Sequence, residues 1–172
     1  MKDVKKILAG MMVLAAVSPS AFAEPGPLER ALIGTWRIAD YVAVREDGDE
    51  VRPMGKDLAG YIMYAADGHL SVNLTKPGRA KYASGDIMQS TVEERAAAAD
   101  GYFAYAGTFK VDEANRLVIH RVLYSLMPNW VDTEQRRMIF LDGDKLELRS
   151  PGPVMVAGDK RVLRILWERA KR

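Results

Sequence analysis

Three side chains could move protons or stabilise negative charge: Tyr105, His120 and Arg137. A histidine titrates near neutral pH, a tyrosine hydroxyl can pass on a proton, and a guanidinium can stabilise an oxyanion. Together they would suit a cofactor-free isomerase or cyclase that acts on a hydrophobic substrate. A lone histidine on an apolar strand is more often a hydrogen-bonded core residue, so His120 has a structural interpretation as well.

Other kinds of chemistry find little support in the sequence. The chain has two histidines and no cysteine, and it lacks the H-E-x-x-H pattern, the G-x-S-x-G turn and a phosphate-binding glycine loop. We therefore predict no metal site and no cofactor. Without cysteine no disulfide can form, so packing must hold the fold together.

Alternation along the strands indicates which side chains face the interior. In residues 145–150, Leu146 and Leu148 alternate with charged residues, so the leucines should face inward. A two-residue turn at Asp142-Gly143 would place Ile139 opposite Leu146, Arg137 opposite Leu148, and Gln135 on the same inner side. A three-residue turn would instead bring Met138 and Phe140 inward.

The same argument applies to the strand that holds His120. With Arg121 facing solvent, Val118, His120, Val122 and Tyr124 should face inward.

A buried Arg137 needs a partner, because an unpaired guanidinium in the interior is costly. Asp40 alternates with Trp36, Ile38 and Val42 and is a candidate for an internal salt bridge. The alternative is that an anionic group of a ligand contacts Arg137.

The elements that position these residues are predicted to be strands. Short β-like runs separated by Asp-Gly turns are typical of an all-β fold, and they cover residues 35–45, 60–66, 69–75, 102–111, 116–125, 133–141, 145–150 and 160–169. The hairpin-length connections favour an eight-stranded up-and-down antiparallel barrel over two stacked sheets.

Two segments interrupt the strands. Residues 90–100 combine overlapping capping boxes with an alanine run, which predicts one short helix between the third and fourth strands. Residues 76–89 form a long loop, either a lid or binding loop or simply a mobile excursion.

The N-terminus has the pattern of a secretory signal peptide. Lys2, Lys5 and Lys6 precede the apolar residues 7–17 and the small-residue motif Ala21-Phe22-Ala23. We expect cleavage after Ala23, a linker and short helical turn at residues 24–33, and the barrel domain at 34–172. The mature protein would be periplasmic or secreted.

The charge of the mature protein is balanced once the signal peptide is removed, which argues against nucleic acid as a partner. We expect no membrane span in the mature chain.

Motifs at the two ends of the barrel resemble the lipocalin superfamily. Gly34-Thr35-Trp36 opens the first strand and Trp167-Glu168-Arg169 ends the last. In that superfamily such a tryptophan closes the barrel floor and a basic residue of the last strand stacks on it. The resemblance implies this structural role for Gly34, Trp36 and Arg169, with Arg164 as an alternative partner.

The chain is more specifically similar to the bacterial lipocalin-like domain family. The similarity covers residues 32–169. It rests on Gly60-Tyr61-Ile62 with Asp67-Gly68, on Asp100-Gly101-Tyr102 through Tyr105-Ala106-Gly107, and on Pro128-Asn129-Trp130 followed by Gln135 and Arg137. Asp132 departs from the family pattern, in which glycine is frequent at that position. The predicted ligand-binding residues are Tyr105, His120, Tyr124, Asn129, Trp130, Gln135 and Arg137.

The leading hypothesis is thus an exported protein that binds a small hydrophobic or amphipathic molecule inside a barrel. The cofactor-free enzyme with His120, Tyr105 and Arg137 is the alternative, and a barrel filled by its own side chains is a third. An outer-membrane barrel is rejected because charged residues such as Arg37, Glu147 and Arg149 occupy the expected outward positions. The ligand and the oligomeric state stay open.

Overall fold

The fold is described from a computed structural model that covers residues 24–171. The predicted signal peptide, residues 1–23, lies outside this range. Along the chain the elements are α1 (Pro27–Leu32), β1 (Gly34–Val44), β2 (Glu50–Val51), β3 (Ala59–Tyr64), β4 (His69–Thr75), α2 (Val92–Asp100), β5 (Tyr102–Asp112), β6 (Leu117–Ser125), the 3₁₀ helix η1 (Pro128–Trp130), β7 (Glu134–Asp142), β8 (Lys145–Arg149), β9 (Val154–Val156) and β10 (Asp159–Arg169).

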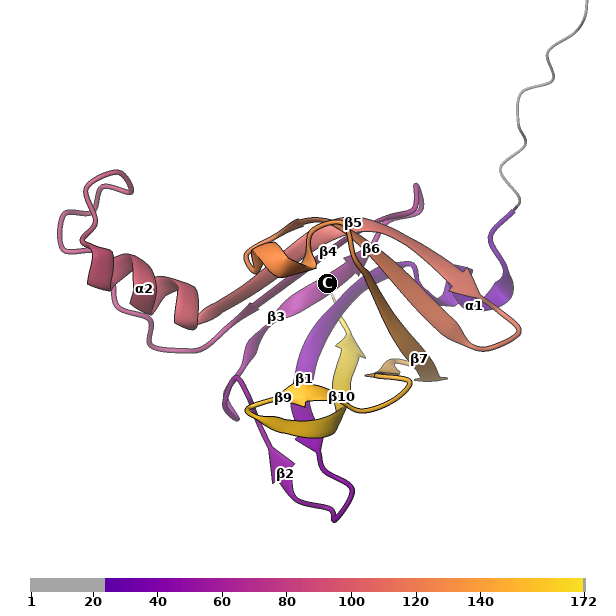
Figure 1. Ribbon diagram of the computed structural model, residues 1–172. Coiled ribbons are helices and arrows are strands. Elements are labelled where there is room, and N and C mark those ends of the chain that lie inside the picture. The colour runs from indigo at the N-terminus through magenta and orange to yellow at the C-terminus, as the bar shows by residue number, and fades with distance from the viewer. Residues whose placement is uncertain (1–23, 172) are drawn as a thin grey trace, which may run out of the picture.

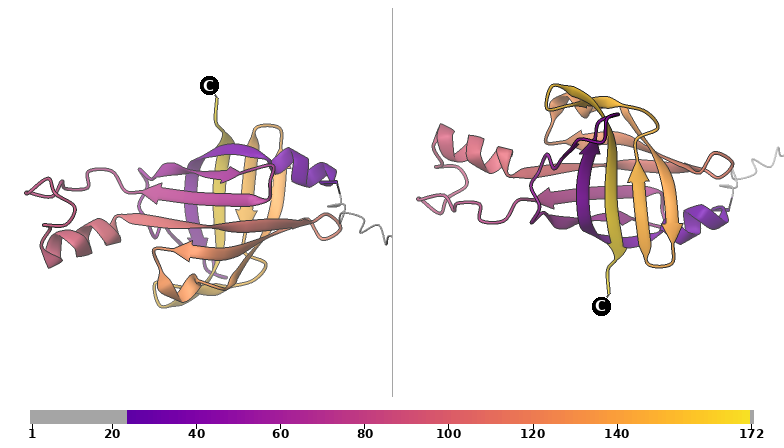
Figure 2. Two further views of the ribbon diagram at one scale, coloured as in Figure 1. Left: turned by 90° about the horizontal axis from the view of Figure 1, so that it is seen from above. Right: turned by 90° about the horizontal axis from the view of Figure 1, so that it is seen from below.

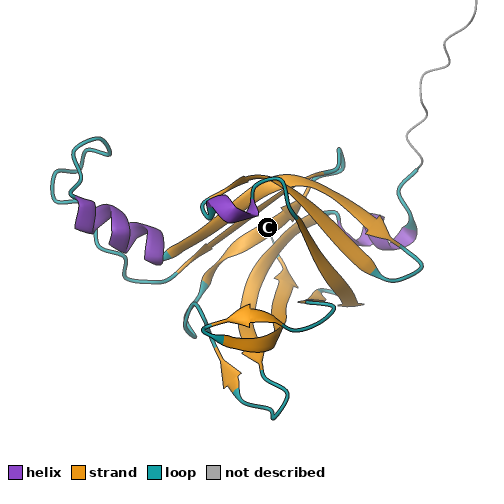
Figure 3. Cartoon of the chain, in the orientation of Figure 1, coloured by secondary structure: helices purple, strands orange, loops and turns teal. Residues whose placement is uncertain are grey.

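The strands form a closed antiparallel barrel (Figures 1 and 2). Consecutive strands pair in the order β1-β3-β4-β5-β6-β7-β8-β10, and pairing of β10 with β1 closes the ring. The predicted eight-stranded up-and-down barrel is therefore confirmed. The two short strands β2 and β9 extend β1 and β10. The helices lie at the ends of the barrel (Figure 3).

The β7–β8 hairpin differs from the predicted register without changing which side chains face inward. Asp142 pairs with Lys145, so the turn residues are Gly143 and Asp144, and Ile139 lies opposite Leu148. The prediction of an Asp142-Gly143 turn was wrong by one residue, which moves the pairing by two. Since side chains alternate with a period of two, Arg137 and Ile139 stay inside, at 7% and 1% exposure.

One end of the barrel is closed by α1. The Trp36 indole, fully buried, donates a 2.8 Å hydrogen bond to the Leu32 carbonyl oxygen. The Arg169 guanidinium carbon lies 4.0 Å from the centre of the Trp36 ring, and its Nη2 donates to the Ala31 carbonyl at 2.8 Å. The structure thus places Arg169 at the ring of Trp36, whereas Arg164 pairs with Glu147.

The segment between β4 and β5 forms an arm, defined here as residues 76–101. The arm projects away from the barrel at the end opposite to α1 (Figures 1 and 2). Its helix α2 begins with the predicted capping box, in which the Thr91 hydroxyl accepts from the Glu94 amide and the Glu94 carboxylate accepts from the Thr91 amide. No residue of α2 is buried, and the arm does not cover the barrel in the structure.

Two β-bulges change the face that a side chain occupies. In the β1–β10 pair the register shifts between Ile38 and Asp40, and in the β5–β6 pair it shifts between Ala106 and Gly107. A bulge inserts one extra residue, so the alternation is reversed beyond it. Asp40 and Tyr124, which follow the bulges, therefore face away from the side that strict alternation assigns to them.

Candidate functional site

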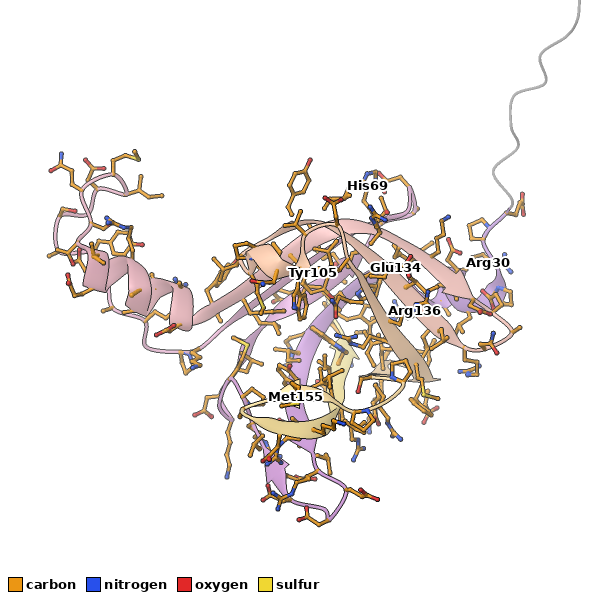
Figure 4. All side chains as sticks on the ribbon, in the orientation of Figure 1. Arg30, His69, Tyr105, Glu134, Arg136 and Met155 are labelled. Carbon is orange, nitrogen blue, oxygen red and sulfur yellow. The ribbon has the colours of Figure 1, made fainter. Side chains whose placement is uncertain are left out.

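A hydrogen-bonded cluster of three side chains lies at the centre of the barrel. The Tyr64 hydroxyl of β3 is 2.8 Å from His120 Nε2, and the Tyr105 hydroxyl of β5 is 2.8 Å from His120 Nδ1. His120 and Tyr64 are 1% and 2% exposed. Figure 4 shows Tyr105 inside the barrel. Both imidazole nitrogens are therefore occupied by protein groups.

The cluster is uncharged at neutral pH. Burial, and secondarily the positive charge of Arg137, lowers the pKa of His120 to about 3. Burial raises the pKa of Tyr105 to about 12 and that of Tyr64 well above its ordinary value. A neutral imidazole has one donor and one acceptor nitrogen, so one tyrosine donates its hydroxyl proton to His120 and the other keeps its O–H free for another acceptor.

Arg137 lies beside this cluster without a carboxylate partner. Its Nη1 donates to the Arg136 carbonyl oxygen at 2.7 Å, and its Nη2 donates to Gln135 Oε1 at 3.4 Å. Among residues 24–171, no ion pair includes Arg137. The interior therefore holds a guanidinium whose charge no neighbouring acid balances.

The predicted Asp40–Arg137 salt bridge is wrong. Asp40 instead accepts from Arg52, at 3.0 Å from Nε and 2.8 Å from Nη2. The bulge in β1 is the physical reason, because it takes Asp40 out of the inward alternation of Trp36 and Ile38 and brings Tyr41 to the cavity instead.

A small cavity adjoins the cluster. Its free volume is about 20 Å³, which is room for about one water molecule. Most of its lining is aromatic or aliphatic, and the lining residues are Tyr41, Ile62, Val72, Leu74, Phe103, Tyr105, His120, Trp130, Arg137, Leu148, Ile165 and Trp167. The barrel is thus nearly filled in this structure.

Trp130 lines this cavity but does not belong to a strand. It belongs to η1, in the connection between β6 and β7, and its ring packs edge-on against Phe103 at 5.2 Å and Tyr105 at 5.7 Å between ring centres. Trp130 is only partly buried. It is therefore a wall residue of the cavity that belongs to a connection and not to a strand.

Trp167 contributes a polar group that has no protein partner. Its side chain is 3% exposed and lines the cavity, and its indole N–H makes no hydrogen bond to any described residue. An unmet buried donor is unusual in proteins. The sequence shows Trp167 only as part of the Trp167-Glu168-Arg169 motif, and its unmet donor cannot be inferred from alternation.

The remaining predicted site residues divide into two groups. Gln135 pairs with His120 across β6 and β7 and contacts Arg137, so it belongs to the cluster. Tyr124 is 73% exposed, and the prediction that it faces inward was wrong because the bulge at Leu123 pairs Tyr124 with the outward Ala106. Asn129 is exposed and is not among the residues that line the cavity, so its predicted contact with a ligand stays a prediction.

The site can hold and orient oxygen atoms, but it offers little to a metal. No group of three or more histidine, cysteine or acidic side chains is arranged for metal binding in the described part of the chain.

Within residues 24–171 no helix has the length and apolarity needed to cross a membrane.

The sequence is similar to a known protein family and to a known carrier protein. Residues 33–170 match the family described as lipocalin-like domain. One similar protein is the 4'-hydroxy-3'-methoxypropiophenone carrier protein ppsC of Aspergillus oryzae, which is 32% identical over 109 residues, or 60% of this chain and 98% of that protein.

Proposed function

The chain belongs to the lipocalin-like domain family, and from this premise we propose that it carries a small aromatic molecule inside its barrel. The observation that carries the proposal is the donor-rich cluster under Trp130, enclosed by aromatic and aliphatic walls. Such sites combine an apolar lining with a few placed polar groups that orient the ligand.

The chemistry of the relative supports an aromatic ligand. Its name states that it carries 4'-hydroxy-3'-methoxypropiophenone, a single benzene ring with oxygen substituents and a ketone. A ring of this kind would pack against Phe103 and Tyr105, whose ring centres lie 5.8 Å apart in an edge-on contact. Its oxygens would accept hydrogen bonds from the interior donors.

Binding requires the barrel to open, because a benzene ring needs a cavity on the order of 150 Å³ and the cavity holds about 20 Å³. We propose that Trp130 moves outward with η1 and that the ligand ring takes its place against Phe103 and Tyr105. An indole occupies enough space for one substituted benzene ring. In the described chain the three residues of η1 make no hydrogen bond to a barrel strand, so η1 can move while the flanking bonds of Leu126 to Ala104 and of Asp132 to Val122 stay in place.

Titration calorimetry with 4'-hydroxy-3'-methoxypropiophenone and simpler hydroxyphenyl ketones tests the proposal. We expect wild-type protein to bind at least one of them. Ile165→Trp adds bulk at a partly buried wall position and should weaken binding by about tenfold or more, equivalent to about 1.4 kcal/mol. Met155→Trp, at a position that is 66% exposed on β9, is the control and should leave affinity unchanged.

If none of these ketones binds and an apolar fluorescent dye also fails, the carrier proposal is wrong and the barrel is a filled scaffold. Equal loss of affinity in both variants would place the ligand outside the barrel.

The carrier proposal is favoured over a cofactor-free isomerase or cyclase. A general base works best when its pKa is near the operating pH, whereas burial lowers the pKa of His120 to about 3. Both of its nitrogens are also occupied by tyrosine hydroxyls. His120 is thus suited to orienting Tyr105 and poorly suited to taking a proton from a substrate.

We propose in addition that the protein is exported after cleavage near Ala23, which is supported by the sequence of residues 1–23. Mass spectrometry of the protein from its own host tests this. A mass that includes residues 1–23 would contradict it.

A further inference from the structure

The groups that face the cavity are almost all hydrogen-bond donors. A guanidinium has five N–H groups, of which Arg137 uses two on described residues. Trp167 adds an indole N–H that has no partner, and one hydroxyl of the Tyr64–His120–Tyr105 cluster keeps its proton free. The lining residues of the described chain include no aspartate or glutamate. A ligand must therefore supply the acceptors.

The cavity lining carries a positive charge and no negative charge, just as it offers mainly hydrogen-bond donors. The titratable groups around Arg137 are Tyr41 on β1, Tyr64 on β3, Tyr105 on β5 and His120 on β6, and the charge of Arg137 influences the pKa of each. All four are neutral between pH 5 and pH 8, since the pKa of His120 is lowered to about 3 and the pKa values of the tyrosines are raised. Arg137 is thus the one charged group among the lining residues described here.

A buried cation without a partner is costly, and an anion that binds beside it removes that cost. We propose that the ligand is bound as an aromatic oxyanion, a phenolate whose charged oxygen accepts hydrogen bonds from Arg137, while its ring packs among the aromatic wall residues. This inference rests on the proposed carrier function and specifies the chemical class and the charge state of its ligand.

The unmet Trp167 N–H gives the same site a second feature. It can donate to one more oxygen, such as the ketone of a hydroxyphenyl ketone, in which the hydroxyl and the carbonyl lie at opposite ends of the ring. Two oxygens at a distance from each other would then fix the ring in one orientation. A cavity with donors at separate positions thus favours a ligand with two acceptors.

The test uses 4'-hydroxyacetophenone, because its phenolate absorbs at longer wavelength than the neutral phenol. The absorbance of the probe bound to the mature protein is followed against pH and compared with the free probe. A cation within about 4–6 Å favours the charged form and lowers a pKa by about 1 to 3 units. We expect the phenol pKa of the bound probe to fall by at least about one unit, so that phenolate is present at pH 7.

Variants assign the effect to Arg137. Arg137→Met removes the charge at similar length and should abolish the fall in the pKa of the bound probe, whereas Arg137→Lys should retain part of it. Arg136→Met is the matched control, because Arg136 is the exposed neighbour on β7 that pairs with Glu134 (Figure 4). It should leave the bound spectrum unchanged.

Two further probes separate the possible sources of an anion. 4'-Methoxyacetophenone cannot ionise. We therefore expect its affinity at pH 7 to be lower than that of 4'-hydroxyacetophenone by about tenfold or more. 4-Methoxybenzoate carries a carboxylate in place of a phenolate. Tighter binding of the benzoate than of the hydroxy ketone would overturn the assignment to phenolates.

The remaining outcomes distinguish this inference from the proposed function. Binding of 4'-hydroxyacetophenone as the neutral phenol, or equal affinity for its methyl ether, would overturn the inference and leave the carrier function intact. Failure of every aromatic probe to bind would overturn both. The wild-type spectrum alone decides the charge state, so the test does not depend on the folding of the Arg137 variants.

Discussion

The neutral, buried His120 should make the stability of the barrel depend on pH. Its pKa is lowered from 6.5 to about 3 by burial and by Arg137. Between these two pH values the unfolded chain binds a proton at this histidine and the native protein does not. The free energy of unfolding therefore rises with pH across this window, is fully gained above pH 6.5, and is lost as pH falls toward 3.

The magnitude follows from the two pKa values. pH 5 is about 1.5 units below the pKa of this histidine in the unfolded chain, so the unfolded histidine is protonated while the native one is still neutral. The protein therefore loses about 2 kcal/mol of stability at pH 5 relative to pH 8. Urea denaturation of the wild type and of His120→Gln at both pH values isolates this contribution. Glutamine keeps one donor and one acceptor for Tyr64 and Tyr105 but does not titrate.

We expect the wild type to lose about 2 kcal/mol more than His120→Gln between pH 8 and pH 5. His69, the other histidine, is exposed and common to both proteins, so its contribution cancels, as do those of the carboxylates. Equal losses would refute the argument that His120 is buried and neutral. An imidazole NMR signal of His120 that titrates above pH 5 would refute it independently.

Three further substitutions test parts of the fold. Gly107→Ala should destabilise the protein by about 3 kcal/mol in urea denaturation, because an added Cβ would lie 1.9 Å from the Arg121 carbonyl oxygen; Gly152→Ala, with nothing within 4 Å, should change stability by less than about 0.5 kcal/mol. Arg169→Met should cost about 2 kcal/mol by losing its stacking on Trp36 and its hydrogen bonds to α1, and an unchanged melting curve would contradict this. Thr91→Ala should weaken α2 by about 1 kcal/mol, which hydrogen exchange would detect in the arm without faster exchange in the barrel strands.

The sequence was a good guide wherever strict alternation or local chemistry decides the structure. Alternating leucines at 146 and 148 set the inner face of β8, and the capping box at Thr91 and Glu94 set the start of α2 within two residues. The inward position of Arg137 followed from alternation even though the hairpin turn was misplaced, because an error of two in the register preserves the face.

The sequence was a poor guide beyond the two bulges. Nothing in the residues around Asp40 or Leu123 marks an insertion, since the extra residue is selected by the pairing of distant strands. The exposed Tyr124 and the Asp40–Arg52 pair are both consequences. The nearly filled cavity was also beyond prediction, because it depends on how side chains from eight strands and η1 share one interior.

Closure of the barrel by β1 and β10 has a consequence for how the chain folds. The two strands come from opposite ends of the domain, and Arg37 and Glu168 across the seam are 131 residues apart in sequence. Contacts of such long range form slowly because the intervening chain must be ordered first. We therefore expect the seam to close last. A chain that ends before residue 159 would leave β1 and β8 as open edges and should aggregate, whereas a cut in the arm should leave the ring closed.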